Sequence, residues 1–142
     1  MLSVPELDGT VLAAGLENGA FQPTGTVPTL PADFTGKNTT AEIEISADGR
    51  FLYASNRGHD SIAVFRAAAA GGVPQFVQRA PCGGKTPRHF KLSPCGKWLL
   101  CAHLQSHTIS VLPRDPATGE LGVAVCTVAA PSQICVVFPP AS

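Results

Sequence analysis

The sequence contains Ile43-Glu-Ile-Ser-Ala-Asp-Gly-Arg-Phe-Leu-Tyr53 and, 47 residues later, Phe90-Lys-Leu-Ser-Pro-Cys-Gly-Lys-Trp-Leu-Leu100, two stretches that align without a gap. The same register continues through Ser61-Ile-Ala-Val-Phe65 against Thr108-Ile-Ser-Val-Leu112. A third match relates Pro87-Arg-His-Phe-Lys-Leu92 to Pro131-Ser-Gln-Ile-Cys-Val136 at an offset of 44 residues. The chain is therefore organised by an internal repeat of 44 to 47 residues.

Within each unit the side-chain pattern has a period of two, which is typical of strands and not of helices. Ala47-Asp-Gly-Arg50 and Pro94-Cys-Gly-Lys97 supply the glycine that a tight hairpin turn needs. We therefore expect four strands in each unit, and place them near residues 41–46, 51–55, 61–66 and 74–80, then 88–93, 98–102, 107–112 and 121–128.

A repeat of this length made of four strands is typical of a β-propeller blade. The predicted fold class is all-β: a partial β-propeller with two complete four-stranded antiparallel blades and incomplete terminal blades. Residues 1–142 then form a single partial propeller domain. Its expected parts are the outer strands of a partial blade at 10–27, blades at 41–80 and 88–128, and the inner strand of a closing blade at 133–138.

Two or three blades do not close a ring, since propellers use about four to eight. The outer sheet faces would then expose more apolar surface than a monomer tolerates. We expect either self-association or missing N-terminal blades. An ordinary β-sandwich is the alternative fold, but a sandwich does not require a repeat of 47 residues.

Composition excludes several classes of protein. Ten basic residues balance ten acidic ones, which argues against nucleic acid as a partner. The first nine residues lack the pattern of a signal peptide, and no apolar run is long enough to span a membrane. The five cysteines show neither CxxC spacing nor a partner histidine motif, so we expect no metal, no cofactor and a cytoplasmic protein with reduced thiols.

The order of the strands predicts where chemistry lies, because the loops that connect D to A and B to C strands meet at one end of a propeller. That end collects all four histidines, together with Glu42, Arg57, Lys85 and Arg88. Glu42 and Arg88 begin inner strands, next to the propeller axis. Glu42 can act as a general base on water, with His89 as the acid or as a partner for a developing oxyanion.

Arg57 and Arg88 are the candidate substrate-binding residues, because a guanidinium binds phosphate or carboxylate through a planar fork. A structural ion pair between Glu42 and an arginine of the neighbouring blade is the alternative. The expected ligand is an anionic small molecule.

The run Thr39-Thr-Ala-Glu-Ile-Glu-Ile-Ser-Ala-Asp-Gly-Arg-Phe-Leu-Tyr-Ala-Ser-Asn-Arg-Gly-His-Asp-Ser-Ile-Ala-Val-Phe65, with Gly84-Lys-Thr-Pro-Arg-His-Phe90, resembles the lactonase family of seven-bladed propellers. The resemblance covers about residues 20–138. It implies hydrolysis of a phosphorylated sugar lactone, as in 6-phosphogluconolactonase, or the lactonising chemistry of 3-carboxymuconate cyclase. The sequence departs from the family at Glu44, where a histidine is frequent, and at Cys95, where an aspartate occupies the turn.

Three functional hypotheses follow. The first is a C-terminal part of a lactonase, with Glu42 and His89 as catalytic residues and Arg57 and Arg88 as anion-binding residues. The second is a carboxymuconate-type cyclase that uses the same residues. The third is a noncatalytic propeller fragment that pairs through its open blade faces.

Overall fold

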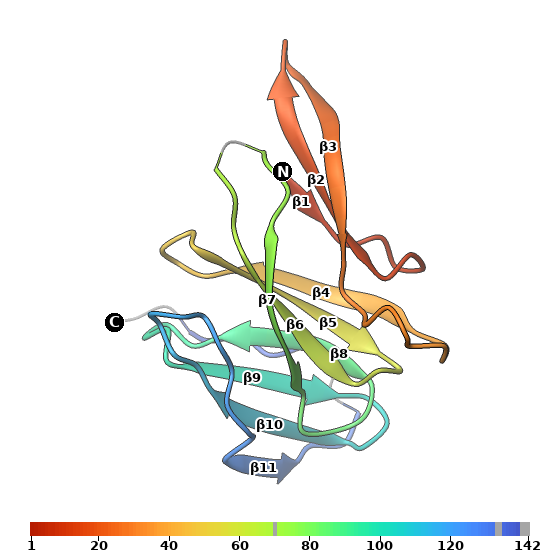
Figure 1. Ribbon diagram of the computed structural model, residues 1–142. Helices are drawn as coiled ribbons and strands as arrows, with labels where there is room; N and C mark the ends of the chain where they lie inside the picture. Colours follow the sequence, from red (N-terminus) through yellow and green to blue (C-terminus); the bar gives the residue numbers. More distant parts are fainter. Residues whose placement is uncertain (70, 133–134, 140–142) are drawn as a thin grey trace.

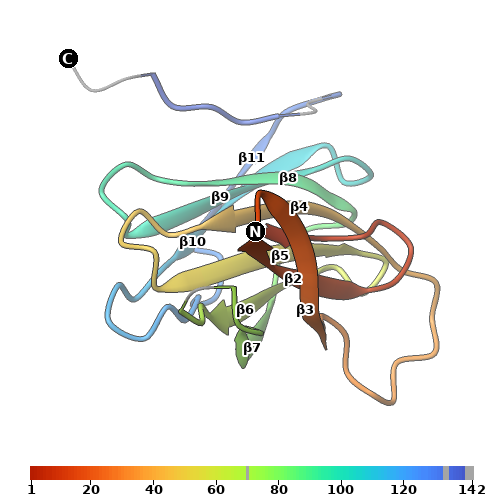
Figure 2. The same ribbon diagram turned by 90° about the horizontal axis from the view of Figure 1, so that it is seen from above.

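The computed structural model describes residues 1–69, 71–132 and 135–139, and every regular element within those ranges is a β-strand. The strands form three antiparallel sheets that succeed one another along the chain and pack side by side (Figure 1 and Figure 2). Among the described residues, no helix is long and apolar enough to cross a membrane.

The first sheet has three strands and the other two have four. The first contains β1 (Leu2–Ser3), β2 (Thr10–Glu17) and β3 (Ala20–Pro28). The second contains β4 (Thr39–Ile45), β5 (Phe51–Arg57), β6 (Ser61–Arg66) and β7 (Gln75–Pro81). The third contains β8 (Pro87–Leu92), β9 (Trp98–His103), β10 (Thr108–Pro113) and β11 (Cys126–Ala129). In each sheet, strands that are consecutive in sequence pair with one another, which confirms the predicted fold class.

The two hairpin turns of the repeat are built alike. Gly49 and Gly96 have φ angles of 71° and 70°, a region that glycine enters without steric cost. The backbone N–H of each donates to the carbonyl of Ser46 or Ser93 at 2.8 Å. Each serine hydroxyl also accepts the first backbone N–H of the next strand, at 3.0 Å from Phe51. The repeated letters thus encode a repeated set of hydrogen bonds.

The middle blade is buried on both faces, as the continuous apolar run at the start of β5 requires. Phe51 and Tyr53 of β5 face β8–β11 and join a core with Phe90. Leu52, the intervening residue, faces the other way and joins a second core with Val11 of β2. Successive side chains of a strand point to opposite faces, so β5 holds three sheets together.

Buried polar contacts link each sheet to the next. The Tyr53 hydroxyl donates to the Gly119 carbonyl at 2.8 Å and accepts a hydrogen bond from Arg114 Nε. Asn56 and His103 occupy equivalent repeat positions, and both are fully buried. Asn56 Nδ2 donates to the Thr29 carbonyl at 3.1 Å, and His103 Nε2 lies 3.1 Å from the Cys82 carbonyl oxygen. Each ties its blade to the end of the preceding outer strand.

The termini differ most from the expected strands. The short strand β1 was not predicted; it pairs with β2 through Leu2 and Ser3. The expected strand at 121–128 is reduced to β11, preceded by an isolated bridge between Leu121 and Arg114. Of the inner strand expected at 133–138, the first two residues lie outside the described ranges, and Cys135–Phe138 is not part of a strand.

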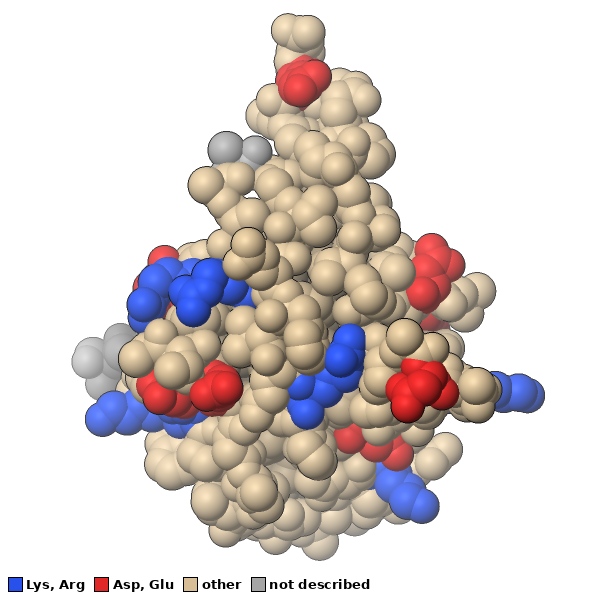
Figure 3. All heavy atoms as spheres, viewed as in Figure 1, with Lys and Arg blue, Asp and Glu red and all other residues tan. Residues whose placement is uncertain are grey.

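Large apolar side chains remain exposed on the two outermost sheets. Leu16 and Phe21, on the β2–β3 hairpin, are 66% and 56% exposed. At the other end of the molecule, Val125 and Val128 are 64% and 48% exposed. Apolar groups therefore remain uncovered on the flanking sheets, and Figure 3 shows little charge on this face over β2 and β3.

Candidate functional site

The candidate site residues are positioned by two β-bulges, which occur at equivalent places in the repeat. The pairing of β4 with β5 shifts register between Thr40 and Ile43, and the pairing of β8 with β9 shifts between Pro87 and His89. A bulge adds a residue to one strand and re-aims the neighbouring side chains. Glu42 lies within the first bulge and Arg88 within the second. The Ser55 hydroxyl fixes the first by accepting the Glu42 backbone N–H at 3.0 Å.

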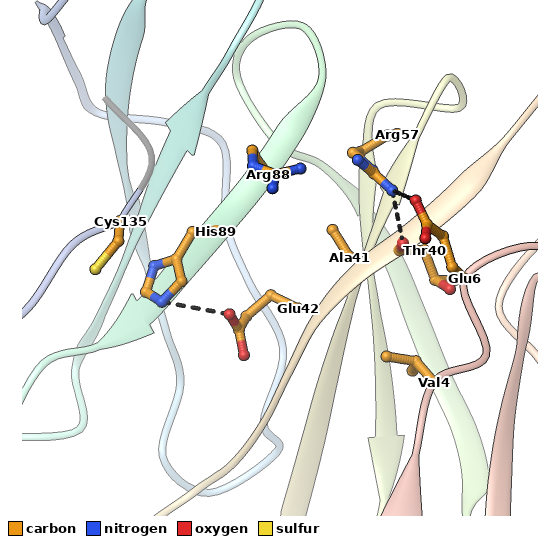
Figure 4. Close-up of a pocket in the computed structure, with 9 residues that line it drawn as sticks. All are labelled: Val4, Glu6, Thr40, Ala41, Glu42, Arg57, Arg88, His89 and Cys135. Atoms are coloured by element: carbon orange, nitrogen blue, oxygen red, sulfur yellow. Dashed lines mark hydrogen bonds and ion pairs between the residues drawn. The ribbon is translucent and has the colours of Figure 1, made fainter. Parts of the chain in front are cut away.

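These bulges open onto one cavity of about 370 Å³ between the inner strands of the second and third sheets (Figure 4). All four residues selected from the sequence line it: Glu42, Arg57, Arg88 and His89. Its other lining residues are Val4, Glu6, Thr40, Ala41 and Cys135. The structure therefore brings the predicted residues together, although they come from separate blades.

Glu42 and His89 form a close pair in this cavity. Glu42 Oε2 lies 3.3 Å from His89 Nε2, and the two side chains are 31% and 21% exposed. The Val136 backbone N–H donates to His89 Nδ1 at 3.2 Å. Because Nδ1 accepts that hydrogen bond, the proton of the neutral ring is on Nε2 and faces the carboxylate. The pair consists of a carboxylate acceptor and an imidazole donor that both reach solvent.

The two arginines of the cavity have different surroundings. Arg57 Nη2 donates to Glu6 Oε1 at 2.6 Å and to the Thr40 carbonyl at 3.1 Å, and the Arg57 side chain is only 15% exposed. Its Nε atom is buried and has no hydrogen-bond partner in the part of the chain that the structure describes. Arg88 is exposed, and no hydrogen bond or ion pair links it to another residue of the described ranges. Of the two cavity arginines, Arg88 is therefore the one without an ion-pair partner among the described residues.

Sequence reasoning missed Glu6 and Cys135 as cavity residues. Glu6 follows a two-residue strand that is too short to show alternation, so nothing in the sequence placed it near Arg57. Cys135 follows two residues outside the described ranges; it is exposed and lines the cavity next to His89 (Figure 4). Both lie in the terminal segments, where the repeat is incomplete.

The other histidines do not line this cavity. His103 is buried, and its ring nitrogens lie 3.2 Å from the Thr108 carbonyl and 3.1 Å from the Cys82 carbonyl. Burial opposes protonation of this ring, but the contacts with Cys82 and with the two carbonyls outweigh it and raise the pKa of His103. His59 is tied to Ser61, with Nδ1 and Oγ 2.7 Å apart. His107 is exposed in a turn.

Glu44, where the family frequently has a histidine, has a structural role. Its carboxylate oxygens lie 2.7 Å from Lys91 Nζ and 2.8 Å from the Leu92 backbone nitrogen. It thereby links β4 to β8, two residues along β4 from Glu42. No cluster of three or more histidine, cysteine, aspartate or glutamate side chains suited to a metal occurs among the described residues.

Comparison with known proteins identifies the family. A family model described as "Lactonase, 7-bladed beta-propeller" matches residues 2–138. The chain is 37% identical to the 6-phosphogluconolactonase of Bacillus subtilis over 120 residues, covering 84% of this chain and 34% of that protein.

Two solved structures also match. One, a protein from Lactobacillus plantarum, has a TM-score of 0.88 and 32% identity, over 94% of this chain and 40% of the other. The other is the periplasmic gluconolactonase of Pseudomonas aeruginosa, with a TM-score of 0.84 and 36% identity, over 89% of this chain and 36% of the other. The chain spans about 40% or less of the length of these relatives. The chain, which spans part of the length of such a propeller, belongs to the lactonase family of seven-bladed β-propellers.

Proposed function

We propose that this chain supplies part of the active site of a lactonase that opens a phosphorylated sugar lactone with water. The observation that carries the proposal is the placement in one cavity of a carboxylate–imidazole pair, Glu42 with His89, and of the Arg88 guanidinium, which has no ion-pair partner among the described residues. The match to a 6-phosphogluconolactonase supports the substrate class.

In the proposed reaction Glu42 accepts a proton from water as the water oxygen bonds to the lactone carbonyl carbon. The His89 Nε2–H donates to the carbonyl oxygen as it becomes an oxyanion. The bond from that carbon to the ring oxygen then breaks, and the proton held by Glu42 passes to the ring oxygen. The product is the hydroxy acid, with the atoms of water added across the broken bond.

The anionic group of the substrate is held by Arg88, which is exposed in the cavity. A guanidinium presents several N–H donors in one plane, which suits the oxygens of a phosphate. The formal charges of the cavity are two arginines against Glu6 and Glu42, so an added anion does not enter a strongly negative site.

The test is hydrolysis of 6-phosphogluconolactone by the wild-type chain and by Glu42→Gln, with Glu17→Gln as the control. Glu17 is exposed at the end of β2, outside the cavity. We expect Glu42→Gln to lower kcat by about a hundredfold, the usual contribution of a general base, and Glu17→Gln to leave it unchanged. Unchanged turnover in Glu42→Gln would remove the assigned role. Substrates of the carboxymuconate type, assayed in parallel, test the cyclase alternative.

A noncatalytic, self-associating propeller is the second candidate, and the exposed apolar groups of the outer sheets favour it. Leu16, Phe21, Val125 and Val128 present apolar surface at opposite ends of the molecule. A chain without turnover above the uncatalysed rate that sediments as a stable oligomer would support this candidate over the lactonase.

We also propose a cytoplasmic location. All five cysteines are unpaired in the structure, and reduced thiols are typical of that compartment. Alkylation of intact cells with a membrane-permeant and an impermeant maleimide distinguishes the locations, since only the permeant reagent reaches cytoplasmic thiols.

A further inference from the structure

One of the two arginines in the cavity, Arg57, is already paired with an acidic residue, Glu6. Glu6 Oε1 and Arg57 Nη2 are 2.6 Å apart, the distance of a charge-assisted hydrogen bond. The second hydrogen on Nη2 is used by the Thr40 carbonyl at 3.1 Å. Both donors of that nitrogen are therefore engaged before any ligand arrives.

The backbone at Glu6 is fixed by hydrogen bonds, although the Glu6 side chain is 66% exposed. The Glu6 carbonyl accepts the Thr40 backbone N–H at 2.9 Å, and the preceding carbonyl, that of Pro5, accepts the Thr40 hydroxyl at 2.6 Å. These two bonds fasten the segment to β4. Figure 4 shows the resulting arrangement, with Glu6 and Thr40 on the same side of Arg57.

A ligand anion that approached Arg57 would meet a carboxylate there. It would have to displace Glu6 from Nη2 or bind beside it, and two like charges at one guanidinium repel each other. Arg88 carries no such partner among the described residues and is exposed in the same cavity. The two arginines, both predicted from the sequence to bind the ligand, therefore differ in how available their guanidinium groups are to an anion.

We propose that Glu6 is a specificity-determining residue, which neutralises Arg57 and directs the anionic group of the ligand to Arg88. This inference rests on the proposed function and narrows its substrate class: one free guanidinium suits a lactone with a single anionic group, such as a phosphate, over a substrate with several carboxylates. Arg57 acts as a positioning residue that connects the Glu6 segment to β4.

The test is titration of the full chain with inorganic phosphate in five proteins. These are the wild type, Arg88→Ala, Arg57→Ala, Glu6→Gln and the double variant Glu6→Gln/Arg57→Ala. Binding is monitored in ¹⁵N–¹H NMR spectra. Glu17→Gln is the matched control for removal of one acidic charge away from the cavity. Thermal unfolding of each variant confirms that it is folded before titration.

We expect Arg88→Ala to weaken phosphate binding by about tenfold, the effect of losing one charge-assisted contact, and Arg57→Ala to change it by less than about twofold. Glu6→Gln should strengthen binding by about fivefold, since it removes the competing charge while keeping a side chain of the same size. That gain should disappear in the double variant, because it depends on Arg57.

Equal losses in Arg57→Ala and Arg88→Ala would overturn the proposal, as would unchanged or weaker binding in Glu6→Gln. Absence of phosphate binding in both the wild type and Glu6→Gln would also overturn it. Phosphate binding does not require turnover. A failure of this inference is therefore distinguishable from a failure of the lactonase proposal, which depends on the Glu42→Gln assay.

Discussion

Glu42 and His89 occupy the same position of the repeat on neighbouring blades, 47 residues apart in sequence and 3.3 Å apart between Oε2 and Nε2. A single repeat position on the inner strand, within the bulge of β4 and directly after that of β8, thus contributes a carboxylate from one blade and an imidazole from the next. The pair exists only where two blades meet, so a single blade has half of it.

Substitution of His89 should affect turnover more than substrate binding. His89→Asn removes the Nε2–H donor proposed for the oxyanion, while Arg88, the residue proposed to hold the anionic group, remains. We expect kcat to fall by about a hundredfold and KM to change by less than about threefold, measured by steady-state kinetics with 6-phosphogluconolactone. His107→Asn is the control, because His107 is exposed and has a φ of 52°, a region that asparagine tolerates. Equal losses in the two variants would contradict the role of His89.

Tyr53→Phe should weaken the contact between the second and third sheets. The change leaves the Gly119 carbonyl and Arg114 Nε without the buried hydroxyl that joins them. Loss of a partner for buried polar groups costs about 1–3 kcal/mol. We expect the free energy of unfolding to fall by that amount, measured by urea titration. Thr118→Ala is the control, because Thr118 is exposed and lies directly before Gly119. It should change the free energy of unfolding by less than about 0.5 kcal/mol.

The turn at Asp48 should make stability depend on pH in the acid range. Hydrogen bonds from Ser46 and from the side chain and backbone of Arg50 hold the pKa of Asp48 well below its usual range. The stabilisation is complete above the pKa of an unfolded aspartate, about 4, and declines below it, because the unfolded chain then takes up a proton that the folded turn does not. The difference in Tm between the wild type and Asp48→Asn should therefore narrow between pH 5 and pH 2. A constant difference over that range would contradict this account.

Cys95→Asp should stabilise the equivalent turn of the next blade. Cys95 Sγ lies 3.3 Å from the Ser93 hydroxyl, where the first turn has a carboxylate oxygen 2.6 Å from Ser46. An aspartate would accept stronger hydrogen bonds from that hydroxyl than a thiol does. We expect a higher Tm at pH 7, measured by calorimetry. A gain that persists unchanged at pH 2 would show that the carboxylate is not its cause.

Three of the five cysteines should react with a thiol reagent in the native protein. Cys95, Cys126 and Cys135 are exposed, whereas Cys82 and Cys101 are buried. A hydrogen bond from Ser93 and the Lys97 backbone N–H lower the pKa of Cys95, so we expect it to react first. Mass spectrometry after brief alkylation gives the order of labelling. Modification of Cys82 or Cys101 before unfolding would contradict the buried positions.

The blades were predictable because the repeat carries its own hydrogen bonds. Ser46, Gly49 and Phe51 recur as Ser93, Gly96 and Trp98 and make the same turn contacts. Where the repeat is incomplete, prediction fails. The apolar run at Val123–Val128 resembles a long strand, yet Val123 and Val125 are exposed and only its C-terminal end pairs with β10.

The site was predictable in its residue types but not in its pairing. Strand order placed Glu42, Arg57, Arg88 and His89 at one end of the propeller, and all four line one cavity. The difference between the two arginines depends on Glu6, which lies between β1 and β2 and contacts Arg57 of β5, a contact that no local pattern encodes. His103 has the same chemistry as His89 but is buried between sheets, because its repeat position is that of Asn56.

The register shifts of β4 and β8 have an evolutionary consequence. The ladder on either side of each shift is fixed by apolar residues such as Ile43 and Phe90, whereas the bulged residue contributes nothing to the ladder. A substitution there leaves the paired residues on either side unchanged and replaces a side chain that lines the cavity. Descendants of one ancestral blade can therefore acquire an acid, a base or a cation independently, one blade at a time.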